Sequence, residues 1–162
     1  MNHIWTPWRM KYIQENGDVK GCVFCLAAAG DDGLDNLVFH RGEGGFMILN
    51  RYPYTSGHVM CVPYDHVDRL QDLPRAIRLE LMDMVCKAVE VLQLVYRPEG
   101  FNIGLNLGKV AGAGIADHLH MHIVPRWGGD TNFMSAVGQT RVLPESLSET
   151  YRRVKEAWDA FA

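Results

Sequence analysis

The feature that most constrains this chain is the run His118-Leu119-His120-Met121-His122-Ile123-Val124-Pro125, where three histidines alternate with apolar residues. Successive side chains of a β-strand point to opposite faces, so the alternation predicts a strand. The three imidazoles would share one open face. Leu119, Met121 and Ile123 would share the other face and pack on a core.

Three explanations of the imidazole row can be compared. A polar face that is His-rich by chance is the least favoured, since amphipathic strands normally mix their polar residues. A metal site is a second explanation, but at about 3.3 Å per residue the outer histidines start roughly 13 Å apart. One ion could then bind an adjacent pair and hardly all three. The third explanation is covalent catalysis, with one imidazole as nucleophile and its neighbours handling orientation and protons. We favour covalent catalysis, and we leave open whether one of the outer imidazoles also binds a metal.

Composition limits the class of protein. The chain has 162 residues, 48% of them hydrophobic and 22% charged, which suits one domain over residues 1–162. A net charge of −3 gives no broad basic surface, so we expect no nucleic-acid partner. No apolar run is long enough to span a membrane, and the first residues lack an apolar leader, so we expect a cytoplasmic protein.

Local patterns predict the other elements. Apolar runs between turn residues predict strands at residues 36–41, 45–50, 59–63 and 101–106. Apolar residues at three-to-four spacing predict helices at 74–97 and 144–161, and a short helical piece is expected near 8–14. Trp5 and Trp8 should be covered by the domain or by a second subunit.

The glycine-rich loop Gly108–Gly114 leads directly into the histidine run. It is not a dinucleotide-binding fingerprint, because a strand and not a helix follows it. It is either a flexible connection or a phosphate cradle, in which glycine backbone N–H groups approach an anion closely. We favour the cradle, because Lys109 adds positive charge and the loop adjoins the histidines.

Cys22 and Cys25 form a CxxC pair. Such a pair is a redox couple, half of a zinc site or a chance spacing. The redox explanation is weakened because the glycine-containing segment from Gly30 soon interrupts any helix after the pair. A zinc site would need about four ligands, and the candidates for the other two are His66 and one histidine of the run.

Taken together, these motifs resemble the histidine triad (HIT) superfamily of nucleotide hydrolases and transferases. The flanking motifs, which begin at Trp5, Gly21, Asn50 and Pro125, are similar to its bacterial branch of diadenosine tetraphosphate phosphorylases. The resemblance implies an α+β fold with an antiparallel sheet of about five strands, packed helices and a homodimer. It also implies a structural zinc ion, and the matching ligands here are Cys22, Cys25, His66 and His118.

The same resemblance implies a reaction. His120 would attack the α-phosphorus of a dinucleoside polyphosphate to form a nucleotidyl-histidine, with His122 bonding phosphate or leaving-group oxygens and His118 orienting the strand. His58 matches a histidine that relatives keep near the triad, and we expect it to hydrogen-bond the triad or the backbone. Magnesium would accompany the substrate, and no organic cofactor is expected. The predicted nucleotide contacts are Ile48, Asn50, Asn106, Lys109, Gly112, Gly114 and Trp127, while Arg126 would meet phosphate or be structural.

One departure from the family pattern bears on the reaction. Hydrolytic members usually carry Gln and then Ser or Thr before the first triad histidine, and here the stretch is Gly114-Ile115. The smaller side chains could leave room for inorganic phosphate as the second nucleophile, which favours phosphorolysis. Hydrolysis of dinucleoside polyphosphates or phosphoramidates, and nucleotide binding without turnover, are the alternatives.

Overall fold

A five-stranded sheet forms the centre of the computed structural model, which describes residues 21–130 and 145–161. The strands run in the spatial order β1-β2-β3-β5-β4, and every neighbouring pair is antiparallel. The predicted α+β class is therefore confirmed. The strand bounds are Val38–Arg41 (β1), Gly45–Leu49 (β2), Val59–Pro63 (β3), Gly100–Leu105 (β4) and Met121–Arg126 (β5).

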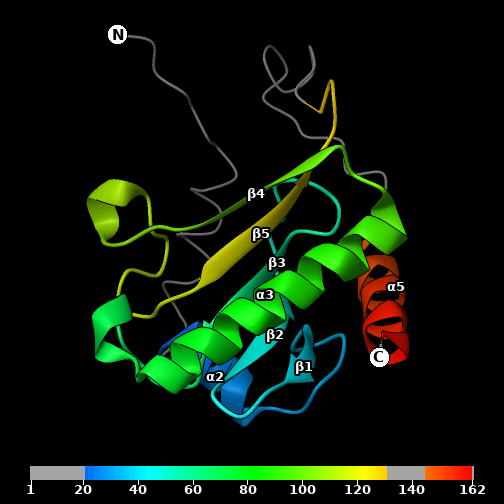
Figure 1. The fold of residues 1–162 in the computed structure, drawn as a ribbon. Coiled ribbons are helices and arrows are strands. Elements are labelled where there is room, and N and C mark those ends of the chain that lie inside the picture. Colours follow the sequence, from blue (N-terminus) through cyan, green and yellow to red (C-terminus); the bar gives the residue numbers. More distant parts are fainter. Residues whose placement is uncertain (1–20, 131–144, 162) are drawn as a thin grey trace, which may run out of the picture.

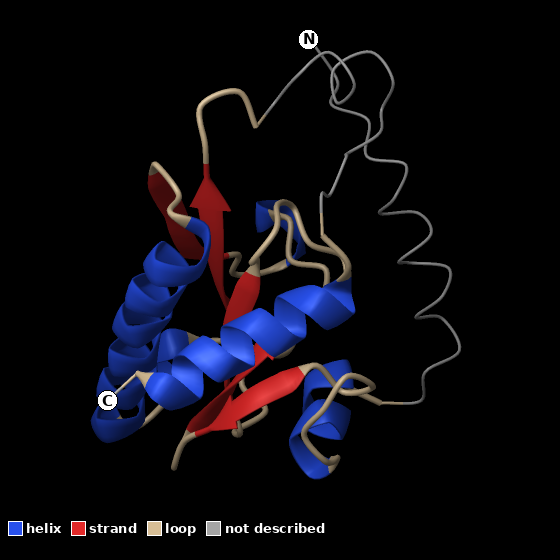
Figure 2. Ribbon diagram, turned by 90° about the vertical axis from the view of Figure 1, so that its right-hand side faces the viewer, coloured by secondary structure: helices blue, strands red, loops and turns tan. Residues whose placement is uncertain are grey.

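Helices lie on both sides of this sheet (Figures 1 and 2). The long helix α3 (Arg75–Tyr96) crosses one face, and α5 (Leu147–Ala160) packs beside α3 and β1. The short helix α2 (Val23–Ala29) lies on the other side of the sheet. Two 3₁₀ turns, η2 (Leu70–Asp72) and η3 (Lys109–Ala111), complete the described elements. No helix among residues 21–130 and 145–161 has the length and apolar character needed to cross a membrane.

The helices are held by both apolar and polar contacts. α3 buries one apolar face against the sheet, formed by Leu81, Met84, Val85, Ala88, Val91 and Leu92. α5 starts with an N-cap, because the Ser146 hydroxyl accepts the Glu149 N–H. Its Tyr151 hydroxyl donates to the Val38 carbonyl of β1 at 2.9 Å. These contacts fix α5 along the outer strand.

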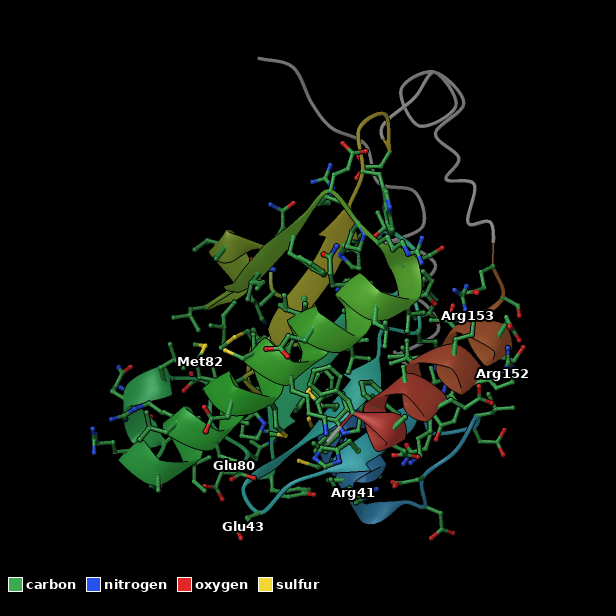
Figure 3. All side chains as sticks on the ribbon, turned by 45° about the vertical axis from the view of Figure 1, so that its right-hand side comes forward. Arg41, Glu43, Glu80, Met82, Arg152 and Arg153 are labelled. Atoms are coloured by element: carbon green, nitrogen blue, oxygen red, sulfur yellow. The ribbon has the colours of Figure 1, made fainter. Side chains whose placement is uncertain are left out.

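Glu80 joins α3 to the turn between β1 and β2 (Figure 3). Its two carboxylate oxygens accept the backbone N–H groups of Glu43, at 2.6 Å, and Gly44, at 2.8 Å. A Cβ at Gly44 would lie 2.3 Å from the terminal methyl carbon of Ile77, so any larger residue there would displace that side chain. These two hydrogen bonds from the hairpin to Glu80 fix the hairpin beside α3, and the opposite face of the sheet remains available for a functional site.

The histidine run departs from the prediction in two ways. The strand begins only at Met121, so His118 and His120 precede it. Their face is also not open, since His118 is 1% exposed and His120 is 6% exposed. The physical reason is that the chain leaves the ladder here: the Leu119 N–H donates to the Val67 carbonyl, and α2 covers the imidazoles. The predicted helix near residues 8–14 and the packing of Trp5 and Trp8 lie outside the described residues.

Candidate active site and metal cluster

One row of side chains across the sheet forms the floor of a pocket. Strand register places Ile48 opposite Met60 and Met60 opposite His122. Helix α2, the loop after β2 and the loop after β4 form the walls around a volume of about 370 Å³. A cavity of this size suits a small organic ligand. The lining includes Val23, Phe24, Leu26, Ala27, Leu37, Ile48, Asn50, Arg51, Tyr52, Tyr54, Met60, Asn106, Gly112, Gly114, Ile115, His120 and His122.

His120 is held in one tautomer by its own chain. Its Nδ1 lies 2.9 Å from the His118 carbonyl, which can only accept, so Nδ1 carries the proton. The lone pair then belongs to Nε2. Burial lowers the pKa of His120 below its usual value, opposed by the bond to His118, so the ring is neutral near pH 7. A neutral imidazole with a lone pair in a pocket is suited to nucleophilic attack.

His122 is held by a second chain of hydrogen bonds. The Tyr54 N–H donates to Nδ1 of His58 at 3.1 Å, so the proton of His58 is on Nε2. That Nε2 lies 2.9 Å from Nδ1 of His122 and donates to it. A neutral His122 therefore carries its proton on Nε2, where it can donate to a phosphate oxygen. The sequence left open whether His58 bonds the triad or the backbone, and in the structure it bonds both.

We expect His58→Phe to lower kcat by a factor on the order of 10 to 100, because His122 loses the donor that fixes its tautomer. KM should change little, since His58 does not line the pocket. Steady-state kinetics with a dinucleoside polyphosphate would measure both constants. An unchanged kcat in a folded His58→Phe variant would contradict the assigned role.

The structure brings some of the predicted nucleotide contacts together and leaves others apart. Ile48, Asn50, Asn106, Gly112 and Gly114 line the pocket with His120 and His122. Asn50 is also engaged in its loop, because its Oδ1 accepts the Tyr52 N–H at 2.9 Å.

Lys109 and Trp127 are not part of the pocket lining. The neighbouring Arg126 is paired with both oxygens of Asp130 and donates to Asn102 at 2.6 Å. Asp130 also accepts the Trp127 N–H at 3.3 Å. The structure therefore supports the structural alternative for Arg126.

The predicted phosphate cradle is already partly occupied by its own hydrogen bonds. The N–H groups of Ala111 and Ala113 donate to the Gly108 carbonyl, and that of Gly112 donates to Lys109. An anion at this loop would have to use N–H groups closer to the histidines. Gly114 and Ile115, which line the pocket, are the nearest positions of that kind.

Several pocket residues were not predicted from the sequence. Phe24 lies with its ring centroid 4.9 Å from that of His120, and Tyr54 stacks 5.9 Å from His122. A signal for Phe24 did exist, since it lies between two cysteines that share a predicted metal site with His118. Any residue fixed there must lie near His120. Tyr54 gave no comparable signal, because its loop resembles an ordinary polar connection.

Four predicted metal ligands meet beside this pocket. The ligand atoms of Cys22, Cys25, His66 and His118 all lie within 4.8 Å of one another. Nδ1 of His118 is 3.3 Å from Sγ of Cys22 and 3.2 Å from Nδ1 of His66, which is 3.2 Å from Sγ of Cys25. A tetrahedral zinc site, with bonds of about 2.0–2.3 Å, places its donors about 3.3–3.8 Å apart. The cluster could therefore hold zinc.

The surroundings of the cluster favour this use. The other nitrogen of His118 donates to the Pro63 carbonyl at 3.0 Å, which leaves the Nδ1 lone pair toward the cysteines. The Asp117 carboxylate lies 3.8 Å from the second nitrogen of His66. Burial, and then the neighbouring Cys22, raises the pKa of the Cys25 thiol, and a cation bound to its sulfur would offset this effect.

Comparison with known proteins agrees with this geometry. The family model described as the HIT domain matches residues 34–129, which include the whole histidine run. This chain belongs to the HIT family. The sequence resemblance to the family is therefore confirmed.

Relatives with assigned activities and a solved structure extend the comparison. An AP-4-A phosphorylase of Mycobacterium tuberculosis is 42% identical over 98% of this chain and 85% of its own length. An asymmetrical bis(5'-nucleosyl)-tetraphosphatase of Schizosaccharomyces pombe is 34% identical over 57% of this chain and 50% of its own. The crystal structure of a Zn-bound histidine triad family protein from Mycobacterium smegmatis superposes with a TM-score of 0.69. That protein is 27% identical and the match covers 86% of this chain and 94% of that one.

Proposed function

We propose that this HIT protein cleaves dinucleoside polyphosphates of the diadenosine tetraphosphate type at an α-phosphate, by phosphorolysis. The observation that carries the proposal is the lone pair on Nε2 of His120, fixed by the His118 carbonyl in a pocket of nucleotide size. The AP-4-A phosphorylase relative, similar over nearly the whole chain, supports this substrate class.

In the first step Nε2 of His120 attacks the α-phosphorus. The N–P bond forms, the P–O bond to the remaining polyphosphate breaks, and its electron pair leaves with the second nucleotide as ATP. His122 donates from Nε2 to a phosphoryl or leaving-group oxygen and so stabilises the charge that develops there. A polyphosphate leaves as a weak base, so it needs little help from a general acid.

In the second step inorganic phosphate attacks the phosphorus of the nucleotidyl-histidine. A P–O bond forms, the N–P bond breaks, and the product is ADP, while His120 recovers its neutral form. Gly114, which has no side chain, lines the pocket and supports room for phosphate beside the adduct. Water in place of phosphate would give AMP, which is the hydrolase alternative.

The deciding experiment is incubation with diadenosine tetraphosphate, with and without inorganic phosphate, followed by chromatography. We expect ADP and ATP, formed only when phosphate is present. AMP and ATP without phosphate would establish a hydrolase and contradict our interpretation of Gly114-Ile115. No turnover under either condition would contradict the proposed substrate class.

We further propose zinc as the metal of the Cys22, Cys25, His66 and His118 cluster, since two thiolates and two imidazoles are a donor set that zinc prefers. Such a metal would supply folding energy and not a reaction step. Magnesium would enter with the substrate, because the described pocket lining includes no Asp or Glu to hold it.

We also propose a homodimer that uses the β4 side of the sheet. β4 is an edge strand, and its Ile103 is 47% exposed. Leu107 and Val110, in the segment that follows β4, are also exposed. Light scattering should give twice the chain mass, and Ile103→Lys should shift it to the monomer; a monomeric wild-type protein would contradict the proposal.

A further inference from the structure

Helix α2 connects the metal cluster to the nucleotide pocket. Cys22 is its N-cap residue and Cys25 lies in its first turn, so both cysteines belong to one end of the helix. Val23, Phe24, Leu26 and Ala27 of the same helix line the pocket. The seven-residue helix and its N-cap residue therefore carry two members of the cluster and one wall of the nucleotide site.

Phe24 makes this connection direct. Its ring centroid is 5.4 Å from that of His118, in an edge contact, and 4.9 Å from that of His120, in a tilted contact. The side chain is 5% exposed, so it has little freedom to move without a change in these contacts. The position of the His120 ring thus depends on where α2 places Phe24.

His118 makes a second connection. Its ring belongs to the metal cluster, and its backbone carbonyl accepts a hydrogen bond from Nδ1 of His120. A rotation of the His118 ring alone leaves this carbonyl in place, but a displacement that includes the backbone of His118 would move it. The bond that leaves the lone pair on Nε2 of His120 would then lengthen.

The two ends of α2 are held differently. At the C-terminal end, Arg41 of β1, which is labelled in Figure 3, donates to the carbonyls of Ala28 and Gly30, each at 2.7 Å. At the N-terminal end, Cys22 provides no side-chain cap. A helix of seven residues is too short to be stable alone, so its N-terminal end depends on contacts of Cys22 and Cys25.

We propose that Phe24 is a positioning residue for the nucleophile, and that the cluster of Cys22, Cys25, His66 and His118 holds Phe24 and the His118 carbonyl in place when it binds its metal. Metal occupancy then determines the orientation and tautomer of His120, beyond its effect on stability. This inference rests on the proposed role of His120 as nucleophile.

The first test is Phe24→Leu in the metal-loaded protein, with Phe46→Leu as the matched control. Phe46 is a buried core residue of β2 and is not part of the pocket lining. We expect Phe24→Leu to lower kcat about tenfold or more, because a displaced nucleophile reacts slowly. Its metal content should stay at one ion per chain. Phe46→Leu should lower the unfolding free energy and leave kcat within about twofold. Equal kcat in wild type and folded Phe24→Leu would overturn the proposal.

The second test does not depend on turnover. Long-range ¹H–¹⁵N NMR distinguishes the two imidazole tautomers, and it should assign the proton of His120 to Nδ1 in zinc-loaded wild type. Two samples are compared with it: Phe24→Leu, and wild type treated with a chelator at a temperature where circular dichroism shows that it is folded. In both, the ¹⁵N shifts of His120 should move toward the average of the two tautomers. A fixed Nδ1–H tautomer in both would overturn the proposal. Absence of turnover by zinc-loaded wild type, with the NMR changes present, would instead count against the proposed function alone.

Discussion

A His120→Ala variant is expected to lose turnover of diadenosine tetraphosphate by a factor on the order of 10⁴ or more. The reason is that the variant lacks the Nε2 lone pair that forms the bond to phosphorus, and no other group in the described pocket has an equivalent position. AMP binding should persist, because most of the pocket lining is unchanged. Product formation measured by chromatography, together with calorimetric binding of AMP, would check both parts.

His40→Ala is the matched control for this variant. His40 lies on β1 beside Trp158 and is not part of the pocket lining, so turnover should stay within about twofold. When the reaction is stopped at alkaline pH, the mass of the wild-type protein should be higher by one adenylyl group. The mass of His120→Ala should not change. Full activity without His120 would exclude the covalent mechanism.

Loss of the proposed zinc ion should have the second large effect. Cys22→Ser would remove one candidate ligand from a cluster that joins α2, the segment after β3 and the histidine run, so the folded state would lose a link between distant parts of the chain. We expect Tm to fall by roughly 10 °C or more, and the zinc content to fall well below one ion per chain. Thermal unfolding followed by circular dichroism and metal analysis would measure these effects.

The chain contains its own control for this substitution. Cys86→Ser makes the same chemical change at an exposed thiol of α3, far from the cluster in sequence, and should move Tm by no more than about 2 °C. Chelation should lower the Tm of Cys86→Ser as it does that of wild type. Equal Tm values for Cys22→Ser and Cys86→Ser would contradict a stabilising metal.

Sequence patterns predicted the elements well where a local period decides the structure. The apolar period of residues 74–97 predicted α3, and turn residues around Phe46–Leu49 predicted β2. The alternation at His118–His122 was less informative. An alternation of apolar and polar residues indicates which side chains share a face. It does not indicate whether a neighbouring strand is present to form hydrogen bonds with that segment. His118 and His120 precede the ladder because the Leu119 N–H between them bonds to Val67 and the two rings face α2.

The site was predictable to the extent that its residues belong to recognisable motifs. The CxxC pair and the histidine run indicated their own chemistry, the need for further zinc ligands made His66 a candidate, and the family resemblance supplied Asn50. Contacts between distant segments were not predictable, since no local pattern records them. The stacking of Tyr54 on His122 and the pairing of Arg126 with Asp130 and Asn102 are examples.

The two edges of the sheet differ in a way that limits assembly. The outer carbonyl of Val38 on β1 accepts from the Tyr151 hydroxyl and the Gly33 N–H, and a bulge interrupts this short strand. Another chain would find few regular backbone partners there, while β4 still presents an edge. If two copies pair edge to edge through β4, as proposed, the pairing would end there, since each copy would then turn only its obstructed margin outward. We expect truncation before Ser146, which removes α5 from this margin, to favour open-ended polymerisation.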